Sequence, residues 1–367
     1  MKIVYDSQIF AEQEYGGISR YVCALASQMS GLSDVEIKVV APLHVNRYLK
    51  GLGKDIVVGC YVPRLPKTAR LIRSLSAALC VPVAGLMHAD IVHETYYAER
   101  SPWSAQVPHV LTIYDMIEER FPESFVAGYP LAQRKRCAVN RAAHVFCISE
   151  NTRRDLLDLH RLPEDRVSVT YLGYDKLPLS GPKAQDLVGA SPFILYVAGR
   201  HGYKNFEGLI RAYAASDWLM GNFRIVCFGG GPFLPAEHAL MAALGLTGSQ
   251  VLHVGGDDER LAALYKAAVA LVYPSKYEGF GIPPLEAMSL DCPVICSNSS
   301  SIPEVVGDAG EYFDPFDLES IKTSIEQVLQ SSQRRLELVS LGQTRCKLFS
   351  WERCAHETLD VYRRLAR

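Results

Sequence analysis

Two glutamates stand eight residues apart around a glycine turn, within residues 273–286 of the chain. Glu278 precedes Gly279, Phe280 and Gly281, and Glu286 follows them. The apolar run 268–273 predicts a buried strand, and prolines at positions 283 and 284 are typical of a first helical turn. Glycines admit close backbone approach, and a helix start favours an anion such as a diphosphate. Because carboxylates accept hydrogen bonds from sugar hydroxyls, we expect both glutamates to contact one ligand that joins a phosphate to polyols.

Taken singly, each glutamate has a simpler explanation. Glu278 alone fits a solvated loop, and Glu286 alone fits a charge near a helix N-terminus, where the dipole favours it. The complete string, with its glycines and Phe280 in place, favours the ligand site.

A basic loop follows a second predicted strand, in residues 195–205. Gly199 and Arg200 end this strand, Lys204 follows, and a helix is expected from about Phe206. Arg binds phosphate oxygens in a bidentate manner, and Lys acts as a compact charge. Two ordinary surface cations would give the same pattern. Beside the glycine turn the pair predicts a diphosphate site, where each preorganised contact supplies ~2–4 kcal/mol to a leaving group.

Gly16 and Gly17 form a third candidate. They follow the first predicted strand and precede an apolar helical pattern. Adjacent glycines before a helix admit an anion, although the same pair is common in ordinary turns.

The chain alternates strand-like runs with helical patterns, which is typical of a parallel sheet covered by helices. The first series of predicted strands covers residues 2–5, 36–41, 91–93, 109–113, 144–148 and 167–171. The second covers 193–198, 224–228, 250–254, 269–273 and 293–296. Residues 175–192 between them are rich in Pro, Gly and Ser and predict a linker. We therefore expect two doubly wound α/β domains whose ligands lie beyond the carboxyl ends of the strands.

Composition narrows the class of protein. The chain has 367 residues, a formal net charge of −2 and 49% hydrophobic residues, which fits a two-domain globular protein and argues against nucleic-acid binding. Its ten cysteines are scattered without a CxxC pair, as expected for reduced thiols in the cytoplasm. The start of the chain predicts a strand and no secretory signal. The apolar segment 75–87, which contains Pro82, is expected to be too short to span a bilayer.

The segment from residue 38 to about 80 is basic and then amphipathic. Its charged residues up to position 73 are Lys38, Arg47, Lys50, Lys54, Arg64, Lys67, Arg70 and Arg73 against Asp55. Such a segment either lies on an anionic membrane surface or is a solvated helix face, and the sequence leaves both open.

No Asp-x-Asp pair occurs in the chain. A magnesium-dependent nucleotide-sugar site would use paired carboxylates beside phosphate oxygens. Phosphate charge is expected to be met here by basic side chains and helix N-termini, with no metal and no other cofactor.

Residues 273–286 resemble the Glu-x7-Glu motif of the retaining GT-B glycosyltransferases of family 4 (glycosyl transferases group 1), and the resemblance covers nearly the whole chain. It implies two Rossmann-like domains facing across a cleft: residues 1–178 on the acceptor side, and 190–349 for the nucleotide sugar. The amphipathic tail 350–367 is implied to return to the first domain, and packing on its own domain is the alternative.

The resemblance also assigns residues. It implies donor binding by Gly16, Gly17, Tyr114, Gly199, Val254, Glu278, Gly279, Phe280, Gly281, Ile282 and Glu286, and catalytic roles for Arg200, Lys204 and Glu278. Tyr114 stands where the family has a His, which makes proton transfer at this position doubtful. Asp115 and His93 are candidates for the acceptor side. A backbone hydrogen bond at the strand end explains Asp115 equally well, and a lone histidine at a strand end is more often structural.

The implied reaction transfers a hexosyl unit, mannose or a 6-deoxyhexose, from a nucleoside diphosphate sugar with retention of configuration. GDP is the expected nucleotide, with UDP and dTDP still open. The acceptor would be a glycan or lipid-linked glycan in surface polysaccharide (O-antigen-like) synthesis, on the inner face of the membrane. A phosphorylase would need a pyridoxal lysine that the sequence does not identify. The other alternative is a non-catalytic glycan-binding or scaffold subunit.

Overall fold

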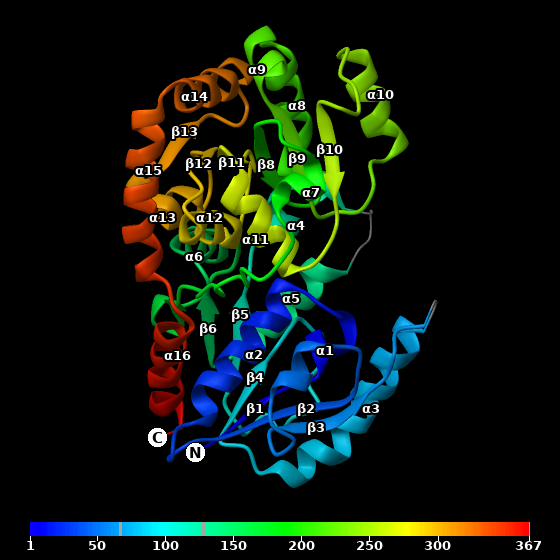
Figure 1. The fold of residues 1–367 in the computed structure, drawn as a ribbon. Coiled ribbons are helices and arrows are strands. Elements are labelled where there is room, and N and C mark those ends of the chain that lie inside the picture. Colours follow the sequence, from blue (N-terminus) through cyan, green and yellow to red (C-terminus); the bar gives the residue numbers. More distant parts are fainter. Residues whose placement is uncertain (66–67, 126–129, 201, 367) are drawn as a thin grey trace. The chain divides into compact units, whose positions relative to one another are not determined.

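A computed structural model describes residues 1–65, 68–125, 130–200 and 202–366. The chain divides into two compact units, Met1–Gly173 with Phe349–Arg367, and Tyr174–Leu348. Each unit holds one parallel sheet with its helices (Figure 1). The predicted fold class, two Rossmann-like α/β domains with the C-terminal helix returning to the first, is confirmed.

The sheet of the first unit has the strand order β3-β2-β1-β4-β5-β6-β7. Its strands are β1 (Lys2–Tyr5), β2 (Glu36–His44), β3 (Val57–Tyr61), β4 (Ile91–Glu94), β5 (His109–Ile113), β6 (His144–Cys147) and β7 (Val167–Val169). Ile3 of β1 pairs with Ile37 of β2 and Ile91 of β4. The order reverses between β1 and β4, so the loops that leave these two strands diverge and open a crevice.

Within the described residues the first unit also contains seven α-helices and several 3₁₀ turns. The α-helices are α1 (Gln8–Glu12), α2 (Gly17–Ser30), α3 (Ala69–Met87), α4 (Ile117–Arg120), α5 (Leu131–Arg141), α6 (Glu150–Leu159) and α16 (Trp351–Leu365), and the longest 3₁₀ turn is η1 (Tyr48–Gly51). The shorter turns are η2 (Pro122–Ser124) and η3 (Glu164–Arg166).

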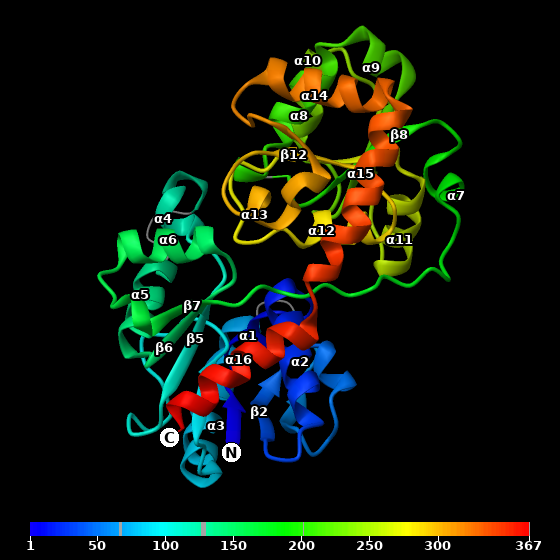
Figure 2. The same cartoon turned by 90° about the vertical axis from the view of Figure 1, so that its left-hand side faces the viewer.

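Helix α16 belongs to the first unit although it lies at the end of the chain. It packs along α2 (Figure 2), with the rings of Tyr21 and Trp351 6.2 Å apart. Tyr362 is fully buried, and its hydroxyl lies 3.4 Å from that of Tyr5 on β1 and 2.5 Å from Nδ1 of His93 on β4. The apolar face predicted for the tail is therefore the face that contacts the first sheet.

The sheet of the second unit has the order β10-β9-β8-β11-β12-β13. Its strands are β8 (Phe193–Val197), β9 (Arg224–Phe228), β10 (Val251–Val254), β11 (Ala270–Tyr273), β12 (Val294–Ser297) and β13 (Gly310–Phe313). Its helices are α7 (Ala184–Val188), α8 (Phe206–Ala214), α9 (Asp217–Asn222), α10 (Pro235–Ala243), α11 (Asp258–Ala267), α12 (Ile282–Ser289), α13 (Ile302–Val306), α14 (Leu318–Gln330) and α15 (Ser332–Arg345), with the 3₁₀ turns η4 (Gly202–Lys204), η5 (Gly307–Ala309) and η6 (Cys346–Leu348). The order reverses between β8 and β11.

Three elements differ from the sequence-based prediction. The edge strands β3 and β13 were not predicted, because both are short and only partly buried, so neither shows a continuous apolar run. In β3, Gly59 has φ +157°, at a place where β2 and β3 shift register between Val40 and Leu43. The predicted linker contains α7, and it groups with the second unit.

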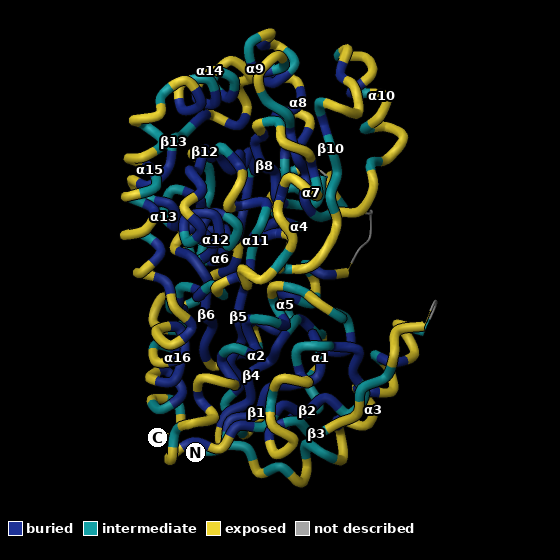
Figure 3. The backbone as a smooth tube through the Cα atoms, viewed as in Figure 1, coloured by how far each residue is buried: buried dark blue, intermediate teal, exposed yellow. Residues whose placement is uncertain are grey.

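Helix α3 is longer than the apolar segment predicted for this region. It spans 19 residues with Pro82 inside it, because it begins at Ala69 and not near Leu75. By length and composition the helix is sufficient to cross a membrane, and 17% of its apolar window is buried. Figure 3 shows α3 mostly in the exposed and intermediate colours. Lys67, counted above among the basic residues, lies outside the described residues.

Candidate functional site

Glu278 lies in the loop that follows β11, close to the start of α12. Its backbone N–H donates to Oγ of Ser300 (2.8 Å), and Oγ of Ser301 donates to the carbonyl oxygens of Glu278 (2.9 Å) and Phe280 (2.8 Å). These two serines, which the sequence analysis did not single out, hold the turn. Gly281 caps α12 with φ +123°, a conformation that requires glycine, and prolines occupy the first helical turn. The predicted strand–turn–helix order is therefore present.

Lys204 and Glu278 are brought together by two neighbouring strands. Nζ of Lys204 donates to Oε1 (2.7 Å) and Oε2 (2.9 Å) of Glu278. Lys204 ends η4, which follows β8, and β8 pairs with β11. A backbone hydrogen bond from Lys276 to Tyr203 (2.7 Å) joins the two loops. The pair thus lies at the carboxyl ends of the strands where the order of the second sheet reverses, the place where ligands bind in such sheets.

Glu286 lies in the second turn of α12. It is 6% exposed, and its Oε2 accepts a hydrogen bond from the hydroxyl of Tyr265 on α11 (3.2 Å). Burial, and then the charge of Glu286, raise the pKa of Tyr265 well above its usual range, so this phenol stays a donor. The tyrosine fixes one carboxylate oxygen and was missed by the sequence analysis.

The sequence predicted that Arg200 donates to phosphate oxygens, and in the structure its guanidinium donates to groups of the protein. Its side chain is 3% exposed and pairs with Glu237 through Nε (2.9 Å). Its guanidinium also donates to the carbonyl oxygens of Gly229 (3.0 Å), Gly231 (2.7 Å) and Pro232 (2.9 Å). In this structure the guanidinium therefore holds the loop after β9.

That loop needs glycine at three consecutive positions, with φ of +93°, +74° and +76° at Gly229, Gly230 and Gly231. The face of Phe233 lies 4.8 Å from the guanidinium of Arg200. On the neighbouring strand, Val254 ends β10 and is half-buried. The loops after β9 and β10 thus lie at the same edge of the sheet as Lys204.

Gly199 and Ile282 complete the predicted donor residues of the second unit. The carbonyl oxygen of Gly199 accepts a hydrogen bond from the hydroxyl of Tyr196 (2.7 Å), and Ile282 is the first residue of α12. Gly199 lies in the loop after β8, and Ile282 follows the loop after β11. These are the two strands at which the order of the second sheet reverses.

Gly16 and Gly17 stand at the start of α2 in the first unit. Gly17 is the first helical residue, and a Cβ added there would meet nothing within 4 Å. A Cβ at Gly16 would strike the side chain of Gln13, whose Oε1 accepts from the backbone N–H of Ser19 (3.3 Å). The end of the Gln13 side chain would have to move to admit a side chain at position 16, whereas the backbone at Gly17 faces open space.

Tyr114 follows β5 and is 6% exposed. Its hydroxyl donates to the carbonyl oxygen of Thr95 (3.2 Å), and its N–H donates to the hydroxyl of Tyr97 (3.2 Å). Burial raises the pKa of Tyr114 well above its usual range, so the phenol does not transfer a proton near neutral pH.

The side chain of Asp115 makes a local hydrogen bond to the backbone, which is one of the two interpretations of this residue from the sequence. Its Oδ1 accepts from the backbone N–H of Ile117 (3.1 Å). Its carbonyl oxygen accepts from the fully buried Lys135 (3.0 Å), which also pairs with Glu118 and Glu119 at 2.9 Å each. Burial lowers the pKa of Lys135, but the surrounding carboxylates outweigh this and raise it. A buried cation thus fixes the loop after β5.

His93 is buried inside the first unit, where its partners are protein side chains. Its side chain is 0% exposed, with Nδ1 2.5 Å from the hydroxyl of Tyr362 and Nε2 2.9 Å from Oγ1 of Thr112. Burial lowers the pKa of His93 to about 3. The strand β4 is central, so its side chains point into the packed core.

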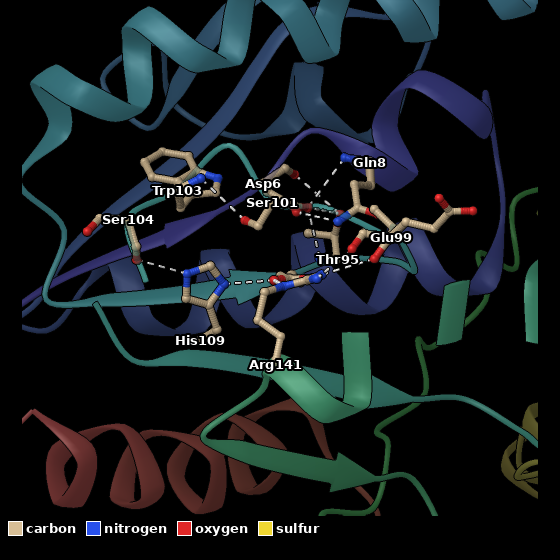
Figure 4. A network of polar contacts seen from close by, with 11 residues as sticks. Asp6, Gln8, Thr95, Glu99, Ser101, Trp103, Ser104, His109 and Arg141 are labelled. Atoms are coloured by element: carbon tan, nitrogen blue, oxygen red, sulfur yellow. Dashed lines mark hydrogen bonds and ion pairs between the residues drawn. The ribbon is translucent and has the colours of Figure 1, made fainter. Parts of the chain in front are cut away.

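A buried polar network occupies the reversal point of the first sheet, as Figure 4 shows. Asp6, after β1, accepts from the N–H (2.9 Å) and Oγ1 (2.7 Å) of Thr95, after β4. Burial, and then the charge of Glu94, raise the pKa of Asp6 to about 6. Glu94 is itself paired with His109 (2.7 Å) and Arg141 (2.6 Å); burial raises its pKa, but these partners outweigh burial and lower it.

Within residues 1–65, 68–125, 130–200 and 202–366, no group of three or more His, Cys, Asp or Glu is arranged to hold a metal ion.

The fold, with one parallel sheet in each of two units, is that of the GT-B class. The family description "Glycosyl transferases group 1" matches residues 182–345, and "Glycosyltransferase Family 4" matches residues 15–176. The chain belongs to the group 1, or family 4, GT-B glycosyltransferases.

Relatives with curated names support the same assignment. The chain is 33% identical to O-antigen chain mannosyltransferase B of Escherichia coli over 237 residues, 62% of either chain. It is 28% identical to the serotype-specific mannosyltransferase WbdA of Escherichia coli over 293 residues, 76% of this chain and 36% of that one. The matches thus span less than two thirds of these relatives. The sucrose-phosphate synthase of Thermosynechococcus elongatus shares the fold, with a TM-score of 0.73 over 100% and 99% of the chains at 20% identity.

Proposed function

We propose that the protein is a retaining glycosyltransferase that moves a hexosyl unit from a nucleoside diphosphate sugar to a glycan or lipid-linked glycan. The observation that carries this proposal is the Lys204–Glu278 pair at the reversal point of the second sheet, beside a helix start capped by Gly281. The cation fits the leaving diphosphate, and the carboxylate, which accepts hydroxyls, fits the sugar of one donor.

In the proposed mechanism the donor diphosphate lies against the start of α12 and Lys204. Glu278 accepts hydroxyls of the donor sugar, with the backbone of Phe280 and Gly281 beside it, and Glu286 accepts the ribose hydroxyls. The acceptor oxygen bonds to the anomeric carbon on the face from which the diphosphate departs. The acceptor proton passes to the departing phosphate oxygen, so configuration is retained. Lys204 stabilises the charge that develops on the diphosphate.

Arg200 receives a revised role within this proposal. Because its guanidinium already donates to three loop carbonyls and Glu237, it acts as a positioning residue for the 229–232 loop. The loop, rather than the guanidinium, would then line the donor site.

The proposed donor is GDP-mannose or a GDP-6-deoxyhexose, and the names of the two mannosyltransferase relatives support mannose. We further propose that no metal takes part and that the acceptor belongs to O-antigen-like polysaccharide synthesis. The site of action would be the cytoplasmic face of the membrane, reached by peripheral contact through the 38–80 segment. The exposed leucines of α3 support such contact.

The test is a calorimetric panel of GDP, UDP, ADP and dTDP. Tight binding of one nucleotide, weakened in Lys204→Met and Glu286→Ala, is expected. Lys266→Met, an exposed lysine of α11, serves as the matched control and should bind as the native protein does. Turnover with the corresponding donor sugar, with and without EDTA, and the anomeric configuration of the product by NMR then test metal independence and retention. Absence of binding by every nucleotide would overturn the proposal.

One observation favours a second candidate, a non-catalytic glycan-binding subunit. Tyr114 replaces the histidine of the family, and its hydroxyl is already committed to Thr95. Glycan binding without release of nucleotide from any donor would support this candidate.

A further inference from the structure

A cavity of about 590 Å³ lies in the first unit, where α1, α3 and α5 meet. Four arginines line it, namely Arg64, Arg70, Arg73 and Arg134. One glutamate, Glu12, also lines it and pairs with Arg73 (Nη1–Oε1 3.1 Å). Four positive charges against one negative leave a formal charge of +3 around the cavity. Within the part of the chain that the structure describes, Arg64, Arg70 and Arg134 have no ion-pair partner. The cavity is therefore suited to an anion.

The start of α3 adds to this field. Ala69 and Arg70 line the cavity and occupy the first turn of the 19-residue helix. That turn contains no acidic residue, and Thr68 makes no side-chain cap. Backbone N–H groups at such a helix start favour an anion in the same place as the guanidinium groups do. Two independent features thus converge on one cavity.

A second cavity of about 380 Å³ continues from the first. It shares Arg73 and Arg134 with it and extends to Ser7, Gln8 and Tyr97. These residues follow β1 and β4, the strands at which the order of the first sheet reverses. The hydroxyl and amide groups there are suited to sugar hydroxyls. The arginine cavity is therefore continuous with the part of the first sheet where a ligand is expected.

The helix that begins at the cavity also carries an apolar surface. Leu71, Leu75 and Leu79 follow each other at intervals of four residues, so they lie on one face of α3, and they are 59%, 46% and 45% exposed. Ile72, Ser76 and Cys80 each follow one of these leucines, so they lie about 100° round the helix from them, and they are buried. Leu71 comes directly after the cavity-lining Arg70, so a ligand with its anionic group in the cavity and an alkyl chain along the leucines would contact both surfaces.

We propose that the arginine cavity binds the phosphate or diphosphate group that links the acceptor glycan to a lipid. The inference rests on the proposed function and adds the chemical class of the acceptor. Phosphate oxygens accept from several guanidinium groups at once, which a single carboxylate cannot do to the same extent. The first sugar of the acceptor would occupy the neighbouring cavity, and the lipid chain would follow the leucines of α3.

The first experiment measures the binding of inorganic pyrophosphate to the full chain by calorimetry, with the donor site saturated by its nucleotide. Arg134→Gln and Arg70→Gln are each expected to weaken binding about tenfold, the loss of one charge-assisted contact. Arg136→Gln, two residues along α5 and exposed, and the exposed Arg161→Gln are the matched controls and should bind as the native protein does. Equal affinity in all five proteins, or no binding in any, would overturn the proposal.

The second experiment identifies the source of the phosphate. Farnesyl diphosphate is compared with pyrophosphate on the native protein and on Leu71→Ser/Leu75→Ser. Tighter binding of farnesyl diphosphate that the leucine variant abolishes supports a lipid-linked acceptor. Equal binding of the two probes, still dependent on Arg134, supports the phosphate site but overturns the lipid.

The nucleotide panel separates this inference from the proposed function. Arg134→Gln should bind the donor nucleotide as the native protein does, because Arg134 belongs to the other unit. If the native protein binds no nucleotide, the transferase proposal is overturned. The pyrophosphate experiment can still be interpreted in that case, because its site lies in the other unit.

Discussion

Lys204 and Glu278 form a nearly enclosed ion pair, with Nζ 2.7 Å and 2.9 Å from the two carboxylate oxygens. Their side chains are 18% and 9% exposed. The two residues are 74 positions apart and meet because β8 and β11 are neighbours. The pair holds each side chain in one place before any ligand binds, which reduces the ordering that binding would otherwise require.

Lys204→Met is expected to reduce nucleotide affinity about tenfold or more, since hydrogen bonds to charged groups contribute ~1.5–3 kcal/mol. It should also lower the free energy of unfolding, because the mostly buried Glu278 carboxylate loses its counter-charge. Calorimetry and urea unfolding measure the two effects.

Glu278→Gln and the double variant Lys204→Met/Glu278→Gln complete a double-mutant cycle for this ion pair. If the residues interact as the distances indicate, the double variant is more stable than the sum of the single losses predicts. Strictly additive losses would mean that the contact contributes nothing in solution.

Arg200 and Glu237 yield the second prediction. If Arg200 acts by holding the 229–232 loop, Glu237→Gln should weaken nucleotide binding in the same direction as Arg200→Lys, because both loosen the same contacts. Arg211→Lys, in an exposed pair with Glu207, is the control. Nucleotide affinity that falls in Arg200→Lys and stays unchanged in Glu237→Gln would instead assign direct phosphate contact to the arginine.

These residues show how far the sequence could predict the site. Lys204 and Glu278 were predicted because their types and the flanking strand–glycine–helix pattern are local. The partners of Arg200 were not, since Glu237 lies 37 residues away and the loop carbonyls have no side-chain signal. Ser300 and Ser301, which hold the turn at Glu278, lie more than 20 residues after it and look like ordinary loop residues.

The fold was predictable for a related reason. Central strands such as β5, buried along its whole length, appear as continuous apolar runs, whereas the partly exposed edge strand β3 does not. The strand position of His93 was likewise visible in the sequence, but its burial against Tyr362, 269 residues away, was not.

His93 gives a prediction of pH dependence. Burial lowers the pKa of His93 to about 3, while an unfolded histidine titrates near ~6.5. Unfolding therefore takes up a proton between these values, so the stability contributed by the neutral ring is complete above ~6.5 and is lost as the pH falls towards 3. His93→Phe should be less stable at neutral pH but lose less stability on acidification. Urea unfolding at about pH 7.5 and about pH 5 measures this, with the exposed His356→Gln as control. Parallel pH profiles for the native protein and His93→Phe would contradict it.

The contribution of Asp6 to the free energy of unfolding should change with pH in the opposite direction. Burial, then the charge of Glu94, raise its pKa to about 6, against an ordinary value of ~3.9. The folded protein then binds more protons than the unfolded chain between these values, so this group's contribution to stability is present at low pH and is lost as the pH rises through 6. From about pH 4 to about pH 6.5, Asp6→Asn should gain ~2 kcal/mol of unfolding free energy relative to the native protein. A relative free energy that does not change over this range would show that Asp6 ionises normally.

The leucines of α3 give the last prediction. Leu75 and Leu79 are 46% and 45% exposed on a helix whose N-terminal end is basic, so they should enter the interface of an anionic membrane. Leu75→Ser/Leu79→Ser should weaken binding to vesicles of phosphatidylcholine with phosphatidylglycerol several-fold, because each buried CH₂ contributes ~0.8 kcal/mol. Thermal stability should change little, since neither side chain is in the core. Leu318→Ser, 42% exposed in the second unit, is the matched control. Vesicle binding that depends on phosphatidylglycerol but is equal in all three proteins would assign the contact to the arginines alone. A fall in thermal stability without a fall in vesicle binding would show that Leu75 and Leu79 pack against protein.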